Sequence, residues 1–336
     1  MPEPFVTIPC LDVHGVTRET RLALFRLVLL QRIAEERVMT LYRQGRIPGS
    51  VYTGRGQEAV AAAGGLALDP TDVIAPLNRE MAAHFARGVT VGDVFRNYLG
   101  KADSPTRGRD GNMHFGMASK DVFPLVSMLG DLCPLIVGAA LAFKRRGEAR
   151  VALTFWGDGA FSVGDVHEGL NLAGVLHVPA VFVIQRNGYA YSTPTTRQML
   201  NTSITERVRG GWSLPCEEVD GTDAIATYVA IRAAVERARN GEGPQAIEAV
   251  SMRMEGHAAH DAGNYMDQDE KRRYETERDP VERLAARLLL DGFSAAEVDS
   301  HRQAASDEVA AGLAEAELSP APDPASLADG VYAQPL

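Results

Sequence analysis

The clearest helical pattern lies in residues 20–45, where apolar residues such as Leu27 and Leu41 recur every three or four positions. This spacing places them on one face of an amphipathic helix, which Gly45 and Pro48 should end. Shorter patterns of the same kind predict further helices over residues 57–68, 79–88, 90–99, 130–144, 164–176, 222–240, 281–290 and 295–316.

Short apolar runs bounded by turn residues predict the strands. The clearest runs are residues 151–155 and 178–184, and others lie at 72–76, 212–219 and 245–252. Continuous apolar runs of this length are typical of parallel strands that are buried on both faces. Because the strands alternate with helices, we expect an α/β fold, a doubly wound and mostly parallel sheet with helical N- and C-terminal extensions.

The chain divides into three segments that we expect to form one domain. Residues 1–19 are irregular and proline-punctuated, residues 20–265 form the α/β domain, and residues 266–336 are a helical C-terminal extension of it. Residues 101–120 form a polar, glycine-rich loop that is long enough to be either functional or disordered. The sequence shows no internal repeat.

The composition excludes several classes of function. With 336 residues, 45% hydrophobic residues, a net charge of −10 and no basic run, the chain is not expected to bind nucleic acid. No apolar stretch is long enough to span a membrane, and the first residues lack the features of a signal peptide. Cys10, Cys133 and Cys216 lie far apart, which favours reduced thiols in a cytoplasmic protein.

The most informative polar residues follow the two clearest strands. The first strand leads into Trp-Gly-Asp-Gly-Ala at 156–160, and the second leads into Asn187, which Gly-Tyr follows. A helix over 164–176 would make the strands parallel and bring Asp158 and Asn187 to one edge of the sheet. A carboxylate, an amide oxygen and a backbone carbonyl suit Mg²⁺, which would take its remaining ligands from phosphate and water.

Residues 157–195 resemble the thiamine diphosphate motif, in which Gly-Asp-Gly is answered by an asparagine after the next strand. More narrowly, the chain resembles the alpha subunit of the decarboxylating component of 2-oxo acid dehydrogenase complexes over nearly its whole length. A Gly-Asp-Gly alone would more often mark an ordinary turn, so the matched pair of strand ends is what favours a metal site. The resemblance implies a thiamine diphosphate-binding fold for residues 20–265.

The same resemblance implies the ligands of the cofactor. Asp158 and Asn187 would bind Mg²⁺ through their side chains, and Tyr189 through its backbone carbonyl. The carbonyl of Ser127 would accept a hydrogen bond from the aminopyrimidine ring, and the side chain of Leu129, by default a core residue, would bend the cofactor. The full set of implied cofactor-binding residues is Arg79, Ser127, Leu129, Gly157, Asp158, Gly159, Ala160, Arg186, Asn187, Tyr189 and His257.

Three positions depart from the usual diphosphate shell of the family. Arg79 aligns with an arginine that contacts the diphosphate, but Asn78 precedes it where tyrosine is usual, and Met81 follows as a second departure. Arg186 stands where asparagine is usual, so it either supplies charge to the diphosphate or points away from it. Arg79 itself could be a merely solvated arginine at a helix start. These departures leave open the alternative that the chain is a noncatalytic scaffold subunit.

Two loop histidines are the implied catalytic residues. His114 lies in the polar loop 101–120, and His257 follows the strand at 245–252, on the same sheet edge as the metal ligands. Imidazole can hydrogen-bond a substrate carboxylate or transfer a proton near neutral pH, although loop histidines are often only solvated. Ala258 stands where mitochondrial relatives carry a regulatory phosphoserine, so this position cannot be phosphorylated.

The activity that the resemblance implies is oxidative decarboxylation of a branched-chain 2-oxo acid or pyruvate, with the acyl unit passed to a lipoyl group on a partner acyltransferase. An acetoin dehydrogenase alpha subunit remains an alternative. Glu58 is not expected to activate the cofactor, because in this family that glutamate comes from a beta subunit. The implied assembly contains two alpha and two beta chains, and this chain alone should be nearly inactive.

Two other enzyme classes fit the sequence less well. A transketolase-type enzyme would carry its activating glutamate in a second domain, for which 336 residues leave no room. A nicotinamide-dependent enzyme would show Gly-x-Gly-x-x-Gly after its first strand, with an acidic residue about 20 positions later, and this fingerprint is missing from the sequence.

Overall fold

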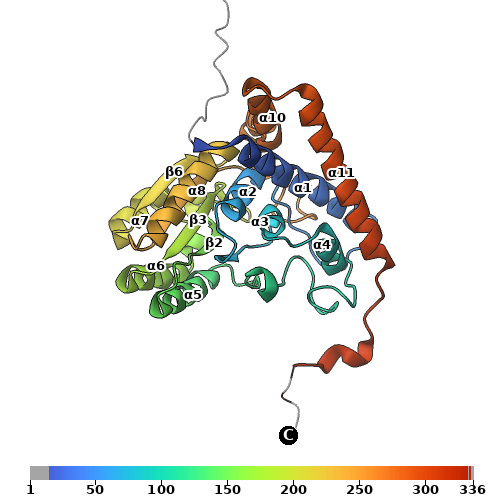
Figure 1. Ribbon diagram of the computed structural model, residues 1–336, viewed down its shortest axis with the longest axis horizontal. Helices are drawn as coiled ribbons and strands as arrows, with labels where there is room; N and C mark the ends of the chain where they lie inside the picture. The colour runs from blue at the N-terminus through green and yellow to red at the C-terminus, as the bar shows by residue number, and fades with distance from the viewer. Residues whose placement is uncertain (1–14, 332, 334–336) are drawn as a thin grey trace, which may run out of the picture.

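A five-stranded sheet forms the centre of the computed structural model, which describes residues 15–331 and 333 (Figure 1). The strands follow the order β1-β2-β3-β7-β6, and all neighbouring strands pair in parallel. This confirms the predicted doubly wound α/β fold. The strands are β1 (Val73–Ala75), β2 (Ala152–Gly157), β3 (Ala180–Arg186), β6 (Cys216–Asp220) and β7 (Gln245–Val250).

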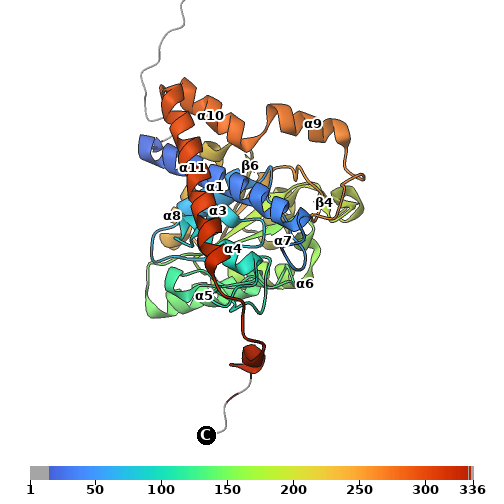
Figure 2. The same cartoon turned by 90° about the vertical axis from the view of Figure 1, so that its right-hand side faces the viewer.

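Helices cover both faces of this sheet. Helices α5 and α6 lie on one face, α2 and α8 lie on the other, and α1, α10 and α11 form an outer layer beyond α2 (Figures 1 and 2). The helices are α1 (Arg18–Arg43), α2 (Glu58–Leu66), α3 (Met81–Ala86), α4 (Val91–Tyr98), α5 (Leu132–Arg146), α6 (Gly164–Leu176), α7 (Ile204–Trp212), α8 (Ala224–Arg239), α9 (Gln268–Glu277), α10 (Pro280–Leu290) and α11 (Ala295–Leu318).

Local sequence signals set several of the helix ends. Helix α1 begins where the side chain of Thr17 accepts a hydrogen bond from the amide of Thr20, at 3.2 Å. Helix α4 begins with a reciprocal capping box, in which Thr90 and Asp93 each bond the other's backbone amide at 3.0 Å. Such caps satisfy amides that a helix start leaves unpaired, which is why most predicted bounds lie within two or three residues of the observed ones.

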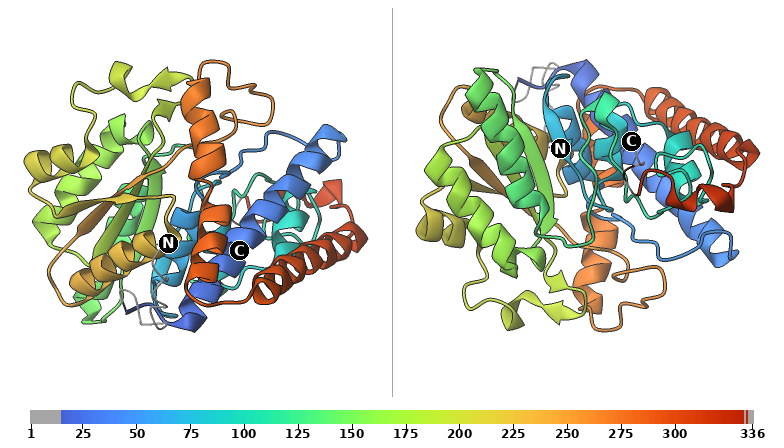
Figure 3. Two further views of the ribbon diagram at one scale, coloured as in Figure 1. Left: turned by 90° about the horizontal axis from the view of Figure 1, so that it is seen from above. Right: turned by 90° about the horizontal axis from the view of Figure 1, so that it is seen from below.

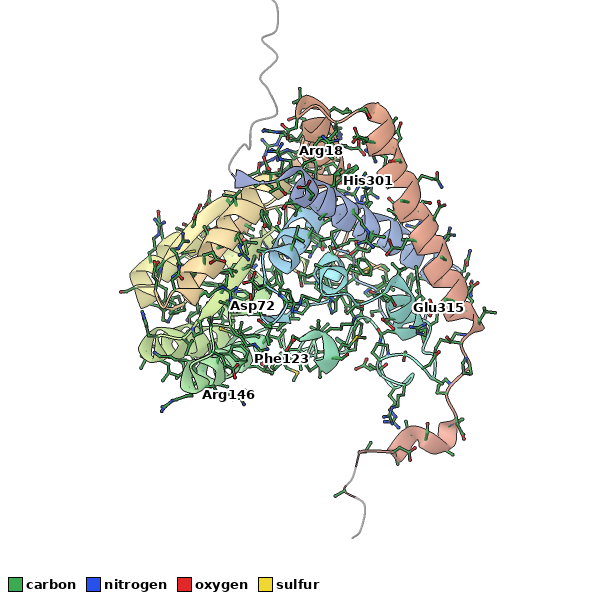
Figure 4. The ribbon with its side chains drawn as sticks, in the orientation of Figure 1. Arg18, Asp72, Phe123, Arg146, His301 and Glu315 are labelled. Atoms are coloured by element: carbon green, nitrogen blue, oxygen red, sulfur yellow. The ribbon has the colours of Figure 1, made fainter. Side chains whose placement is uncertain are left out.

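The sheet is tied to its helices by a buried carboxylate. Asp72, at the amino end of β1, accepts hydrogen bonds from the backbone amide of Val151 at 2.8 Å and from Arg239 of α8 at 2.6 Å. Figure 4 labels Asp72 at this position, well inside the molecule. Because Asp72 is fully buried, removal of Arg239 would leave an unpaired charge in the core.

The C-terminal helix α11 packs lengthwise against α1 and α4. Ala305 and Val309 are buried in this contact, and the ion pair between Arg96 of α4 and Glu315 of α11, at 2.5 Å, lies at its margin (Figure 4). Exposed ion pairs contribute little to stability, so the apolar contact is the main attachment of α11. Within the described residues, no helix combines the length and the apolar character needed to cross a membrane.

Three parts of the predicted secondary structure differ from the observed one. The strand expected at 212–219 begins only at Cys216, because Trp212 ends helix α7, whose start is capped by Ser203. Helices α7 and α9 were not predicted; α9 is almost entirely polar and buries only Tyr274. A two-stranded ribbon, β4 (Tyr189–Ala190) and β5 (Thr193–Pro194), was also missed.

The remaining expectations concern the termini and the cysteines. Residues 1–14, 332 and 334–336 lie outside the described residues, so most of the irregular segment expected at 1–19 cannot be compared with the structure. Cys10 is also outside them. Cys133 and Cys216 are both buried and free.

Candidate active site

A cavity of about 410 Å³ opens at the carboxyl edge of the sheet. The loops that follow β1, β2, β3 and β7 meet there, and the segment between α4 and α5 closes one side. The loops after parallel strands are the usual ligand sites of such sheets. The predicted site residues that line the cavity are Arg79, His114, Ser127, Leu129, Gly157, Gly159, Ala160, Asn187, Tyr189 and His257.

Asp158 lies directly beneath the floor of this cavity and is fully buried. Its Oδ2 accepts hydrogen bonds from Thr195 Oγ1 at 2.7 Å and from the amide of Gly188 at 2.9 Å. Burial raises the pKa of this carboxyl, and the hydrogen bonds lower it in part. The contacts hold the carboxylate against the loop that carries Asn187, which brings the two predicted metal ligands together.

Gly159 is required by the close approach of the two loops that carry the predicted metal ligands. A Cβ atom at this position would lie 2.5 Å from the Cβ of Ala190 and 2.8 Å from its Cα. No real contact between carbon atoms is that short, so a larger residue would push the loop after β3 away from Asp158. The glycine of the Gly-Asp-Gly motif therefore permits the convergence that the predicted metal site needs.

Two arginines line the cavity without a carboxylate partner. In the part of the chain that the structure describes, neither Arg79 nor Arg253 forms a salt bridge; Arg79 is half-buried, and Arg253 is only 2% exposed. Arg79 instead donates to the carbonyls of Thr53 and His257, and Arg253 donates to Tyr265 Oη at 2.7 Å. Burial and the neighbouring Arg253 lower the pKa of Arg79 to about 10. Guanidinium groups that are shielded from water beside a cavity and have no carboxylate partner favour the binding of an anionic ligand.

His257 lies between these arginines and two tyrosine rings. Its Nδ1 is 3.4 Å from Arg79 and 3.5 Å from Arg253, so it must accept hydrogen bonds, and the proton must sit on Nε2. The rings of Tyr52 and Tyr191 pack edge-on against the imidazole, at 5.1 Å and 4.5 Å between centroids. Burial and the two guanidinium groups lower the pKa of His257 to about 4.

This environment predicts the titration of His257. In the cofactor-free protein His257 should stay neutral down to about pH 4, and a bound diphosphate, which offsets the two guanidinium charges, should raise its pKa. Because the unfolded histidine protonates near pH ~6.5, this group should destabilise the fold as the pH falls from there towards 4. NMR of histidine labelled at Cε1, assigned with His257→Gln, measures both values; an ordinary pKa in the free protein would contradict the expectation.

His114 reaches the cavity from the polar loop before α5. Its Nε2 is 3.2 Å from Ser127 Oγ, and its Nδ1 is 3.2 Å from Asp110 Oδ1. Leu129 is 39% exposed and lines the cavity beside Ser127, so it is not the core residue that an apolar stretch suggests by default. The structure thus brings both predicted histidines and both predicted pyrimidine-side residues to the same cavity.

Sequence analysis missed a buried polar chain in the cavity wall. Gln57 donates to Gln185, Gln185 Nε2 donates to Glu80 Oε1 at 2.8 Å, and Glu80 also accepts from the amide of Leu77 at 2.7 Å. Burial raises the pKa of Glu80 to about 7. Arg253 was missed as well, because arginine and glutamine are mostly exposed in proteins and only the fold shows that these residues are buried.

Arg186 is not in the cavity, which corrects its predicted role as a cofactor ligand. Its Nε donates to Glu248 Oε1 at 2.5 Å and its Nη2 lies 3.4 Å from Glu218, both on the neighbouring strands β7 and β6. Glu248 is fully buried, so Arg186 compensates a charge in the sheet instead of one on a ligand. Glu58 is likewise structural, because it is buried against Arg32 at 2.5 Å and does not line the cavity.

The two arginines allow a matched test of this correction. Arg79→Gln should weaken diphosphate binding by about tenfold or more, since it removes a charge-assisted contact. Arg186→Gln should leave that affinity nearly unchanged but lower the free energy of unfolding by about 1–3 kcal/mol, because buried Glu248 loses its partner. Calorimetric titration with the cofactor and chemical denaturation separate the two effects, and equal losses of affinity would contradict the assignment.

The residues present fit a diphosphate held by Mg²⁺. Asp158 and Asn187 offer a carboxylate and an amide oxygen, the hard donors that Mg²⁺ takes, and Arg79 and Arg253 offer positive charge to phosphate oxygens. Within the described residues, no group of three His, Cys, Asp or Glu side chains could hold a metal by itself. Mg²⁺ held by two such oxygen donors would take its remaining ligands from phosphate and water.

Comparisons with known proteins agree with this geometry. The model of the family "Dehydrogenase E1 component" matches residues 25–325. The chain is 33% identical to the alpha subunit of the acetoin:2,6-dichlorophenolindophenol oxidoreductase of Bacillus subtilis, over 95% of each chain. It is also 33% identical to the alpha subunit of the 2-oxoisovalerate dehydrogenase of the same organism, over 95% of this chain and 97% of the relative.

A third relative broadens the range of substrates among these proteins. The chain is 32% identical to the pyruvate dehydrogenase E1 component subunit alpha of Rhizobium meliloti, over 83% of this chain and 80% of the relative. The protein therefore belongs to the dehydrogenase E1 component family, as the motifs after β2 and β3 indicated.

Proposed function

We propose that this chain is the alpha subunit of a thiamine diphosphate-dependent dehydrogenase that oxidatively decarboxylates a 2-oxo acid and passes the acyl unit to a lipoyl group on a partner acyltransferase. The observation that carries the proposal is a pair of arginines without a carboxylate partner, half-buried Arg79 and buried Arg253, which line the cavity beside Asp158 and Asn187 at one sheet edge. The names of the relatives support the reaction class.

Each residue has a part in this proposal. Asp158, Asn187 and the carbonyl of Tyr189 would hold Mg²⁺, and Arg79 and Arg253 would bind the diphosphate. When bound, thiamine diphosphate supplies the electron sink that lets carbon dioxide leave. The remaining cavity residues would position the bound molecules and transfer protons.

The two histidines would differ in role because their surroundings differ. His257, neutral and with its proton on Nε2, can donate a hydrogen bond to a substrate oxygen and give up that proton. His114 is held through Asp110 and Ser127, so its ring is oriented at the other side of the cavity. Ser127 and Leu129 would position the pyrimidine end of the cofactor.

An exposed apolar rim supports a partner chain over the cavity. Met128 is 61% exposed, and Tyr191 and Leu129, which are 48% and 39% exposed, line the cavity. Exposed apolar side chains that gather in one place often mark an interface. We propose that a beta subunit covers it and supplies the carboxylate that activates the cofactor, in an assembly of two alpha and two beta chains. The cytoplasmic location expected from the sequence stays a prediction.

The substrate is proposed to be a branched-chain 2-oxo acid or pyruvate, with acetoin as the second candidate because one relative is named for it. The test is turnover by the chain co-expressed with its beta subunit, given thiamine diphosphate, Mg²⁺ and an artificial electron acceptor. We expect cofactor-dependent turnover that requires both chains, and comparison of pyruvate, 3-methyl-2-oxobutanoate and acetoin identifies the substrate. No turnover with any of them by an intact complex would favour a noncatalytic scaffold subunit.

A further inference from the structure

The chain does not leave the molecule after α11. Residues 319–329, here called the C-terminal strap, pass along the polar loop that precedes α5; seen from below, the red strap lies over this blue-green loop (Figure 3). The strap ends in the short 3-10 helix η5 (Pro324–Ala328), whose start is capped by Asp323. It therefore has local structure of its own where it meets the loop.

Four hydrogen bonds join the strap to residues 101–109 of the loop. The amide of Ala102 donates to the carbonyl of Pro320 at 3.0 Å, and Ser319 Oγ donates to Asp103 at 2.9 Å. Lys101 Nζ donates to the carbonyl of Ser319 at 2.9 Å. In the fourth bond, Arg109 donates to the carbonyl of Ser326. The half-buried residues of the strap, Ser319, Pro322 and Ser326, all lie against the loop.

The far end of the strap holds the loop close to His114. Arg109 Nη2 donates to the carbonyl of Ser326, inside η5. At the neighbouring Gly108, which has a φ of +73°, an added Cβ would lie 2.7 Å from Cγ of Pro322 and 2.8 Å from the carbonyl of Gly100. Only glycine allows this approach, so the strap and the loop are packed to contact.

On its inner side the same loop carries His114. Asp110 follows Arg109, and its Oδ1 lies 3.2 Å from His114 Nδ1. The backbone carbonyl of Asp110 accepts a hydrogen bond from Thr106 Oγ1 at 2.6 Å. Met113 is left-handed, with a φ of +65°. A non-glycine residue keeps this conformation only when its surroundings impose it, so the loop depends on contacts outside itself.

We propose that the C-terminal strap positions His114 for the reaction, with Arg109 as the positioning residue that transmits the contact through Asp110. The proposal rests on the proposed function, in which His114 acts at the cavity. The strap touches the outer side of the loop and His114 occupies its inner side, so loss of the strap would let the ring move away from Ser127 without removing any group that lines the cavity.

The test compares two arginines of one loop in the complex with the beta subunit. Arg109→Ala should lower kcat about tenfold with little change in the KM for the cofactor, as expected for a displaced catalytic group. Arg109→Lys, which can still donate to Ser326, should recover most of the activity. Arg107→Ala is the matched control, because Arg107 is exposed and, among the described residues, makes no side-chain hydrogen bond or ion pair.

A double-mutant cycle with His114→Ala distinguishes positioning from general stability. If Arg109 acts through His114, Arg109→Ala should have no further effect on kcat in the His114→Ala background. An equal loss in both backgrounds, or no loss in either, would overturn the proposal. If His114→Ala itself left activity unchanged, the role of His114 in the proposed function would fail instead.

A second readout does not depend on activity. Replacing residues 320–329 by a glycine–serine segment of equal length should speed tryptic cleavage after Arg107, because the loop is released. An unchanged rate of tryptic cleavage would overturn the proposal that the strap holds this loop. The melting temperature of the same variant, with α11 intact, shows whether the rest of the fold is retained.

Discussion

Replacing Asp158 by asparagine is expected to abolish cofactor binding, with a loss of affinity for thiamine diphosphate and Mg²⁺ of more than about 100-fold. Asparagine keeps the size of the side chain and can still accept from Thr195 and Gly188, which now bond Oδ2. Its amide group would then face the metal, so the change removes charge and one oxygen ligand at once. Calorimetric titration of the complex with the beta subunit measures the loss.

The control for this variant is Asp299→Asn, which changes an exposed carboxylate on α11. It should leave cofactor affinity and turnover unchanged. The cofactor-free Asp158→Asn protein should also melt no lower than the wild type, because burial raises the pKa of Asp158 and its charge is costly to keep. Normal cofactor affinity in Asp158→Asn would refute the metal site.

The second large effect is expected at His257. His257→Ala should lower kcat by about 10²–10⁴, the usual contribution of a general acid or base, with a smaller change in cofactor affinity. The reason is that His257 is the neutral imidazole that Arg79 and Arg253 hold with its proton on Nε2. Steady-state kinetics with saturating cofactor measures kcat directly.

The exposed neighbour His260 offers the control for this second variant. His260→Ala should retain nearly full kcat, since its side chain is not part of the cavity lining. A similar loss in both variants would indicate that the loop, and not the imidazole of His257, is what the reaction needs.

Motifs at strand ends were sufficient to predict which polar residues meet at one edge of the sheet. The apolar runs that became β2 and β3 locate Asp158 and Asn187, and parallel pairing of these strands brings both residues to one edge. The element order therefore carries spatial information that a bare Gly-Asp-Gly does not. Gly159 belongs to the same motif, and its close approach to Ala190 is a packing reason for it.

Arginine positions could not be predicted in the same way. Arg186 ends the buried strand β3 and Arg253 follows the buried strand β7, yet Arg186 points to Glu248 in the sheet and Arg253 points into the cavity. Which way a long side chain points depends on the charge of residues far away in the sequence. For the same reason α9 was missed, since it is held by capping at Asp267 and by the packing of Tyr274 and shows no apolar periodicity.

The most direct test of the account is binding of thiamine diphosphate to the complex of this chain with its beta subunit, measured by calorimetry with Mg²⁺ and again after its removal with a chelator. The account predicts saturable binding, one cofactor for each alpha chain, that is lost with the metal. An intact complex that binds no cofactor in the presence of Mg²⁺ would contradict it.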